Sequence, residues 1–199
     1  MDAQPRKTPK QARSQALVEA ILDAAARILV RDGREAANTN AIAREAGVSI
    51  GSLYQYFPHR EAVLAALLHR HGHRIFARVA NGGTPPATLE QAVDGVVADV
   101  FAAHRIDPVL HDALHHDFGD HDHGEELTTK AAVRARMRGW PAAVQAEIAC
   151  GAPAQAHLVV SEIVHSLAHA ALVHPAEPTD AAALERQAAR AVLAYLRTP

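Results

Sequence analysis

The segment from Thr39 to Phe57 places the tightest constraint on how this chain can fold. It consists of two short helical stretches, TNAIAREA and IGSLYQYF, joined by Gly47, Val48 and Ser49. Glycine can adopt the left-handed conformation that ends the first stretch, and serine is a preferred N-cap for the second. Two short helices joined by a glycine-containing turn are typical of a helix-turn-helix motif. The alternative interpretation is a helical hairpin in an ordinary core, with the tyrosines as core aromatics.

Helical segments are also expected on both sides of this motif. In residues 14–33 one face of a helix is apolar, formed by Leu17, Ile21, Ala24 and Ile28. Ser14 is the expected N-cap of this helix, and Gly33 is its expected end. Asn38 is expected to cap the second helix, and a helix over about 60–80 is expected to follow the motif.

The composition favours helices in the rest of the chain as well. Hydrophobic residues make up 49% of the 199 residues but aromatic residues only 4%, so alanine, leucine and valine must form most of the core. Alanine and straight-chain residues are good helix formers. Further helices are expected near 88–104, from Asp107, in 126–149 with a break at Gly139-Trp140-Pro141, in 153–174 and in 180–197. The sequence therefore predicts an all-α fold of about nine helices, with a three-helix helix-turn-helix domain followed by a larger helical domain.

Charge and cysteine content narrow the class of protein. Residues 1–60 contain nine Lys and Arg against six Asp and Glu, whereas residues 61–199 contain eleven against sixteen. A basic N-terminal part suits contact with a polyanion. Cys150 is the single cysteine, so no internal disulfide can form and the reducing cytoplasm is the expected location. Neither export nor membrane insertion is expected, because the chain lacks an apolar leader and any window of roughly 18 apolar residues.

The second helix of the motif combines side chains suited to DNA with side chains suited to a core. Residues at its start allow close approach to base edges: Ile50, Gly51 and Ser52. Gln55 can bind adenine through both ends of its amide group. Hydroxyls that can donate to phosphate oxygens belong to Ser49, Ser52, Tyr54 and Tyr56. Leu53 and Phe57 have the spacing to pack against the rest of the domain.

The stretch from Ser14 to Leu68 resembles the TetR family of bacterial transcriptional repressors. The resemblance rests on the strings ILDAAARILVRDG and IAREAGVSIGSLYQYFPHREAVL and on their order. It covers little more than the first quarter of the chain. The remainder is similar to the family only in length and in helical character.

The resemblance implies DNA contacts for three groups of residues. The start of the second helix would hold a phosphate through Asn38, Thr39 and Asn40, with Asn40 in reach of a base. The base-facing positions are Ile50, Gly51, Ser52 and Gln55. The phosphate-contacting positions are Tyr54, Tyr56 and Arg60, and the dipole of the fourth helix adds to the attraction at Arg60. Ile50 departs from the polar or basic residue frequent in the family, so contact with a thymine methyl is the alternative there.

The resemblance also implies how the chain is organised. The expected parts are a basic flexible arm (1–13) that adds a minor-groove or phosphate contact, a helix-turn-helix DNA-binding domain (14–60), a connecting helix (61–80) and an effector-binding and dimerisation domain (81–199). The expected function is that of a repressor and not of an enzyme. A repressor of this kind is expected to need no cofactor. Its expected partners are a palindromic DNA operator, a small-molecule effector that releases it, and a second copy bound through the last two helices. The alternatives are that these helices pack only within one subunit, that the protein is an activator, and that two dimers share one operator.

The histidines leave several interpretations open. Fourteen are present, many of them in HDALHHDFGDHDHGEE (111–126), and a solvated polar surface is the simplest interpretation. A second interpretation is an effector pocket lined by His111, His115, Phe118, Met137, Trp140, His165 and His169. A third is a metal-sensing site, because His111 and His115, like His165 and His169, have the i, i+4 spacing that lets two imidazoles bind one ion. The His-Asp doublets also suggest the alternative of a metal-dependent phosphohydrolase. Such a site needs metal ligands from several helices, whereas the doublets lie in one short stretch, so this alternative is not favoured.

Overall fold

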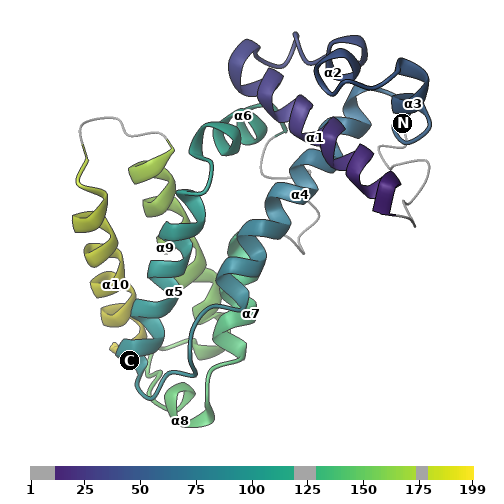
Figure 1. Ribbon diagram of the computed structural model, residues 1–199. Coiled ribbons are helices and arrows are strands. Elements are labelled where there is room, and N and C mark those ends of the chain that lie inside the picture. Colours follow the sequence, from purple (N-terminus) through teal and green to yellow (C-terminus); the bar gives the residue numbers. More distant parts are fainter. Residues whose placement is uncertain (1–11, 119–128, 174–178) are drawn as a thin grey trace. The chain divides into compact units, whose positions relative to one another are not determined.

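The computed structural model describes residues 12–118, 129–173 and 179–199, which form a chain of helices (Figure 1). The helices are α1 (Ala12–Asp32), α2 (Thr39–Glu45), α3 (Ile50–Tyr54), α4 (Arg60–Ala80), α5 (Leu89–His104), α6 (Pro108–Phe118), α7 (Thr129–Arg138), α8 (Ala142–Gln145), α9 (Ala156–Leu172) and α10 (Ala181–Arg197). These residues contain no strand, which confirms the predicted all-α fold. The number of helices in them is ten instead of about nine, because 126–149 is split at Gly139-Trp140-Pro141 into α7 and α8.

The chain divides into two compact units, and each is described by itself. The first unit contains residues 12–71 and 109–118, and the second contains residues 72–108, 129–173 and 179–199. Helix α4 contributes residues to both units. This division differs from the boundaries expected from the sequence, because residues 109–118 belong with the first unit and the division within α4 falls after His71.

The first unit is built on one apolar cluster. Its members come from α1, α2, α3, α4 and α6, and include Ile21, Ile28, Ile42, Leu53, Leu64, Leu67, Leu110 and Leu114. Helix α1 starts at Ala12, so Ser14 lies inside the helix and the prediction that it is the N-cap was wrong. The helix includes residues 12 and 13 because alanine and arginine are both good helix formers. Gly33 follows the last residue of α1 with a φ of 80°, as its predicted role requires.

The short helices of the first unit are fixed by local capping. The Asn38 side chain accepts a hydrogen bond from the Ala41 amide, and Gly47 has a φ of 68°, which confirms both predictions for the ends of α2. Helix α3 is shorter than predicted and ends at Tyr54. It stops because the amides of residues 56 and 57 both bond to the Leu53 carbonyl and Pro58 follows.

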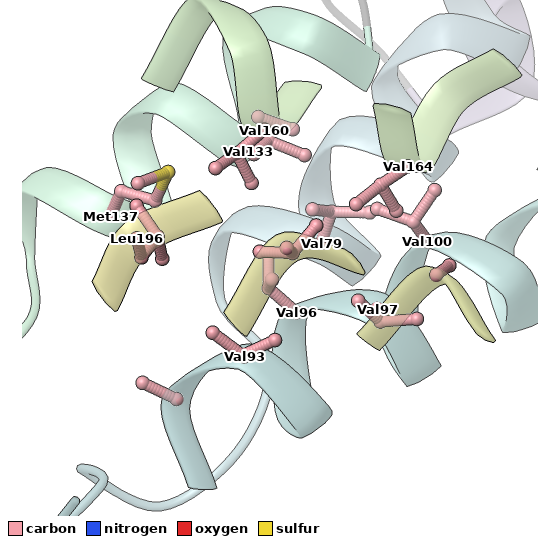
Figure 2. Packing of buried hydrophobic residues seen from close by; sticks show 14 of the residues in the cluster. Val79, Val93, Val96, Val97, Val100, Val133, Met137, Val160, Val164 and Leu196 are labelled. Carbon is pink, nitrogen blue, oxygen red and sulfur yellow. The ribbon is translucent and has the colours of Figure 1, made fainter. Parts of the chain in front are cut away.

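The second unit packs α5, α7, α9 and α10 around a core rich in valine. Figure 2 shows side chains from these helices and from the end of α4 pointing into one apolar interior: Val79, Val93, Val96, Val97, Val100, Val133, Met137, Val160, Val164 and Leu196. Thr88 and Asp180 cap α5 and α10 through their side chains. Cys150 is buried in this core, as expected for a structural thiol.

The part of the chain that the structure describes contains no helix long and apolar enough to cross a membrane. Several features expected from the sequence lie outside that part. They are residues 1–11 of the predicted basic arm and residues 119–126 of the histidine-rich stretch.

Candidate nucleic-acid interface

The N-terminus of α2 is joined to α3 by a hydrogen bond between two predicted DNA-contacting residues. Thr39 Oγ1 lies 3.2 Å from the Tyr54 hydroxyl. Only one of these two hydroxyls donates in this bond, so the other keeps its proton for a second acceptor. The neighbouring Asn40 side chain is exposed, and Asn38 uses its side-chain oxygen to cap the helix at 3.0 Å from the Ala41 amide. The N-terminus of α2 therefore presents ordered donors at the surface.

The N-terminus of α3 is held by a pair of serines. Ser49 Oγ accepts a hydrogen bond from the Ser52 amide at 3.0 Å and lies 2.8 Å from Ser52 Oγ. Because this pair shares one hydroxyl proton, one O–H remains available for an outside acceptor whichever serine donates. Both predicted DNA-contacting serines are thus fixed in position before any partner binds.

Helix α3 separates exposed from buried residues sharply. Ile50 and Tyr54 are 36% and 43% exposed, and Gln55, which follows the helix, is also exposed. Leu53 is fully buried, and Phe57 is 1% exposed. Tyr56 differs from Tyr54 because it is only 8% exposed and belongs to the apolar cluster of the first unit. The predicted phosphate contact of Tyr56 therefore rests on a small part of its surface.

Gly51 lies on the exposed side of α3 in open space. A Cβ atom at this position would have only Ser49 Oγ within 4 Å, at 3.8 Å. Neither the packing of the protein nor a left-handed backbone requires glycine here, in contrast to Gly47. The absence of a side chain lets another molecule approach the helix backbone closely.

The N-terminus of α4 carries a histidine cap that sequence reasoning missed. His59 Nδ1 accepts a hydrogen bond from the Ala62 amide at 3.2 Å, a role that serine, aspartate or asparagine usually fills. The predicted phosphate-contacting residue, Arg60, donates from Nε to Glu61 at 3.1 Å and has Glu35 at 3.7 Å. The pKa of the Glu61 carboxyl is lowered by a hydrogen bond from the Glu61 backbone amide and by the hydrogen bond from Arg60. These ion pairs are exposed and hence weak, so a phosphate can compete for Arg60.

Further charges beside α2 are already paired. Arg27 donates to Glu45 at 2.9 Å, and Arg31 lies 3.7 Å from the same carboxylate. The hydrogen bond from Arg27 and the nearby Arg31 hold the pKa of the Glu45 carboxyl below its ordinary value. Arg44, on the same helix, is exposed and lines a hollow of about 350 Å³ between α1 and α2. The positive charge of α1 is therefore largely neutralised within the unit.

Both units of the chain have counterparts among known proteins. Residues 21–67 match the family model described as "Bacterial regulatory proteins, tetR family", and residues 88–196 match "Tetracyclin repressor-like, C-terminal domain". The chain is 31% identical over 137 residues to the HTH-type transcriptional repressor KstR of Mycolicibacterium smegmatis, which covers 65% of this chain and 67% of that one. It is also 31% identical to KstR of Mycobacterium tuberculosis, over 65% of this chain and 62% of that one.

The fold has relatives among solved structures. A bacterial regulatory protein in the tetR family from Rhodococcus RHA1 matches with a TM-score of 0.68 at 14% identity, over 96% of this chain and all of that one. The second family model covers more than half of the chain. The chain belongs to the tetR family of bacterial regulatory proteins. It is a transcriptional repressor with a helix-turn-helix DNA-binding motif, formed by α2 and α3.

In this tetR-family chain the residues predicted to line an effector pocket come from both units. His111, on α6, belongs to the first unit, where its Nδ1 lies 3.1 Å from Nε2 of His71 on α4. Both rings are buried, at 1% and 4% exposure. Met137, Trp140, His165 and His169 belong to the second unit. His115 and Phe118 lie on α6, but their side chains are outside the described part.

His165 and His169 lie beside a third histidine that sequence reasoning missed. The ring of His104 at the end of α5 is 5.5 Å from that of His165 and 6.3 Å from that of His169, between centroids. His104 is 1% exposed, and its Nδ1 donates to the Val100 carbonyl at 2.8 Å. Burial lowers the pKa of His104, so this imidazole is neutral at neutral pH. The signal in the sequence was its position four residues after Val100, one turn further along the helix expected near 88–104.

Met137 and Trp140 are part of the apolar core of the second unit. They are 6% and 4% exposed, and Met137 points toward Val133 and Leu196 (Figure 2). Among the described residues, no acceptor lies within hydrogen-bonding distance of the buried Trp140 indole nitrogen. The same residues contain no group of three His, Cys, Asp or Glu side chains arranged to hold a metal ion, so nothing in them favours the metal-sensing alternative.

Proposed function

We propose that this repressor binds a palindromic operator as a homodimer and leaves it when a small molecule binds the second unit. One observation carries the proposal. Helix α3 exposes Ile50, Tyr54 and Gln55 while Leu53 and Phe57 fix it to the core. A helix held in this way can enter the major groove without rearranging, and the two helices of a dimer bind successive grooves about 34 Å apart.

The exposed side chains divide into two kinds of contact. Base contacts fall to Ile50, Gly51, Ser52 and Gln55, because they lie at the open start and at the end of α3. Phosphate contacts fall to the amide, hydroxyl and guanidinium groups around them, on Asn38, Thr39, Asn40, Ser49, Tyr54, Tyr56 and Arg60. Phosphate contacts fix orientation and supply affinity for any sequence, whereas base contacts supply specificity.

The dimer is proposed to form through α9 and α10. Ala188 and Val192 on α10 are fully buried within their own subunit, so they are not offered to a partner. Leu158 and Val159 on α9 are large apolar residues that remain exposed, at 48% and 37%. The proposed contact therefore centres on Leu158 and Val159 and on the outer side of α10.

The effector is proposed to bind within the second unit. Its core is mainly apolar. The buried polar groups among the described residues include His104, Thr129, Ser161 and the Trp140 indole nitrogen, and the half-buried His165 and His169 rings lie beside His104. An apolar interior with a few polar groups is typical of small-molecule sites. The effector must bind the released conformer more tightly than the operator-bound one, because only a difference in affinity shifts the equilibrium.

The proposal is tested by selecting genomic fragments with the purified protein at physiological salt and sequencing what is retained. We expect a few enriched fragments that share a palindrome with half-sites about one helical turn apart. Binding that is weak, salt-sensitive and equal for random fragments would contradict operator recognition. The genes beside the enriched fragments would then supply candidate effectors for displacement assays.

A further inference from the structure

The guanidinium of Arg136 on α7 is surrounded by three glycines of the second unit. A Cβ atom on Gly83 or on Gly95 would lie 3.2 Å from Arg136 Nη2. A Cβ atom on Gly82 would overlap both the guanidinium and the Asp99 carboxylate. Gly83 also has a φ of 80°. Glycine at these three positions makes room for a charged group that is itself only 12% exposed in its side chain.

Arg136 uses this space to hold the end of α4. Its Nη1 donates to the Val79 carbonyl at 2.9 Å and to Asp99 Oδ2 on α5 at 2.8 Å. Asp99 is 16% exposed, and Arg78 lies 3.4 Å from its other oxygen. A carbonyl in the last turn of a helix has no partner within the helix, so the bond to Val79 satisfies a group that would otherwise need one. We call Arg136, Asp99 and Gly82 the Arg136 cluster.

Helix α4 connects this cluster with DNA binding, because it contributes to the cores of both units. Its first half contributes Val63, Leu64 and Leu67 to the core of the first unit. Its second half contributes Ile75 and Val79 to the core of the second unit. The Arg136 cluster therefore fixes the far end of the helix whose near end is part of the DNA-binding unit.

We propose that Arg136 is a positioning residue for operator recognition. By tying the last turn of α4 to α5 and α7, it holds α4 in the orientation that lets both DNA-binding units of a dimer fit one operator. The inference rests on the proposed binding of a palindrome by a dimer. It predicts that breaking the cluster weakens binding to the operator but leaves binding to random DNA unchanged, because one DNA-binding unit contacts phosphates without needing the spacing of two.

The test compares two variants that break the cluster in different ways. Gly82→Ala inserts a methyl group between Arg136 and Asp99 and removes neither charge. Asp99→Asn removes the ion pair and keeps the size of the side chain. Asn81→Ala, at an exposed position of the same turn, is the matched control. Binding is measured by fluorescence anisotropy on the selected operator and on a random duplex of equal length, below the unfolding midpoint of every variant.

The ratio of operator affinity to random-duplex affinity decides the outcome. We expect it to fall by about tenfold in both cluster variants, within the usual range of coupling between sites, and to be unchanged in the control. An unchanged ratio in both cluster variants, or an equal loss on both duplexes, would overturn the positioning role. A wild-type protein with no preference for the palindrome would instead overturn the proposed function on which the inference rests.

Discussion

The polar side chains proposed to bind DNA and those proposed to act in regulation lie in different surroundings. The first unit carries Asn38, Ser49 and Tyr54 at the surface of short, capped helices. The second unit encloses polar groups between long helices, with His104 at 1% exposure and the Arg136 side chain at 12%. Surface groups that are fixed in advance can meet a partner without rearrangement, whereas enclosed groups respond only when helices move. The first arrangement suits DNA recognition, and the second suits regulation.

Replacement of Leu53 by alanine should have the largest effect, because it removes the buried contact that supports the exposed side of α3. Leu53 is fully buried, so the loss of packing should cost about 2–5 kcal/mol of unfolding free energy. The free energy of unfolding measured with denaturant and the affinity for the operator should both fall. The neighbouring Ser52→Ala variant is the control and should retain wild-type stability. Equal stability of the two variants would show that α3 does not depend on this contact.

A charge placed on the exposed side of α9 should weaken dimerisation without unfolding the subunit. Leu158 is 48% exposed in the single subunit. If the proposed dimer buries it, Leu158→Lys should raise the dimer dissociation constant at least about tenfold, because a charge would replace an apolar contact. Sedimentation equilibrium measures this constant. Val30→Lys, at a similarly exposed apolar position of α1, should leave it unchanged. A shift in both variants, or in neither, would place the interface elsewhere.

The buried His104 should make the stability of the second unit depend on pH. Burial depresses its pKa in the folded state, so below its ordinary pKa the unfolded chain binds a proton that the folded chain does not. Stability should therefore fall as the pH drops from 7 to 5. His104→Phe removes this titration, so the loss of stability relative to wild type should be largest near pH 7 and smaller near pH 5, and the fall with pH should be less steep. Thermal unfolding at several pH values measures both slopes, and parallel curves would contradict the assignment.

The smallest effect is expected from a surface ion pair of the second unit. Arg105 and Glu185 lie 2.9 Å apart, but their side chains are 44% and 26% exposed. Arg105→Gln should change the unfolding free energy by less than about 1 kcal/mol. A chemical denaturation curve resolves that limit. A larger loss would show that charges at the surface matter as much as those the unit encloses.

The outcome of sequence reasoning differs between features that depend on neighbouring residues and features that depend on distant ones. Asn38, Gly47 and Ser49 were predicted correctly, because each acts on residues within three positions. The cap at His59 is equally local, but it was missed because histidine is seldom an N-cap. Ser14 was wrongly expected to cap α1 because a good cap residue can also lie inside a helix.

Contacts across the fold could not be predicted from spacing. The contact of His111 with His71, forty residues away in the sequence, was not predicted. Gly82 makes room for Asp99 and Arg136 from two other helices, a role that no local pattern in the sequence indicates. The roles assigned to the DNA-contacting and effector-binding residues stay predictions, since they concern molecules other than this chain.

The most direct test of the account is the base preference of four variants on a library of randomised operators, measured by sequencing bound and unbound DNA. Tyr54→Phe and Arg60→Ala should weaken binding to all sequences alike, because they remove phosphate contacts. Ser52→Ala and Gln55→Ala should instead change which bases are preferred at particular operator positions. A uniform loss in all four variants would contradict the division into base and phosphate contacts. Unchanged binding in all four would contradict DNA recognition by α3.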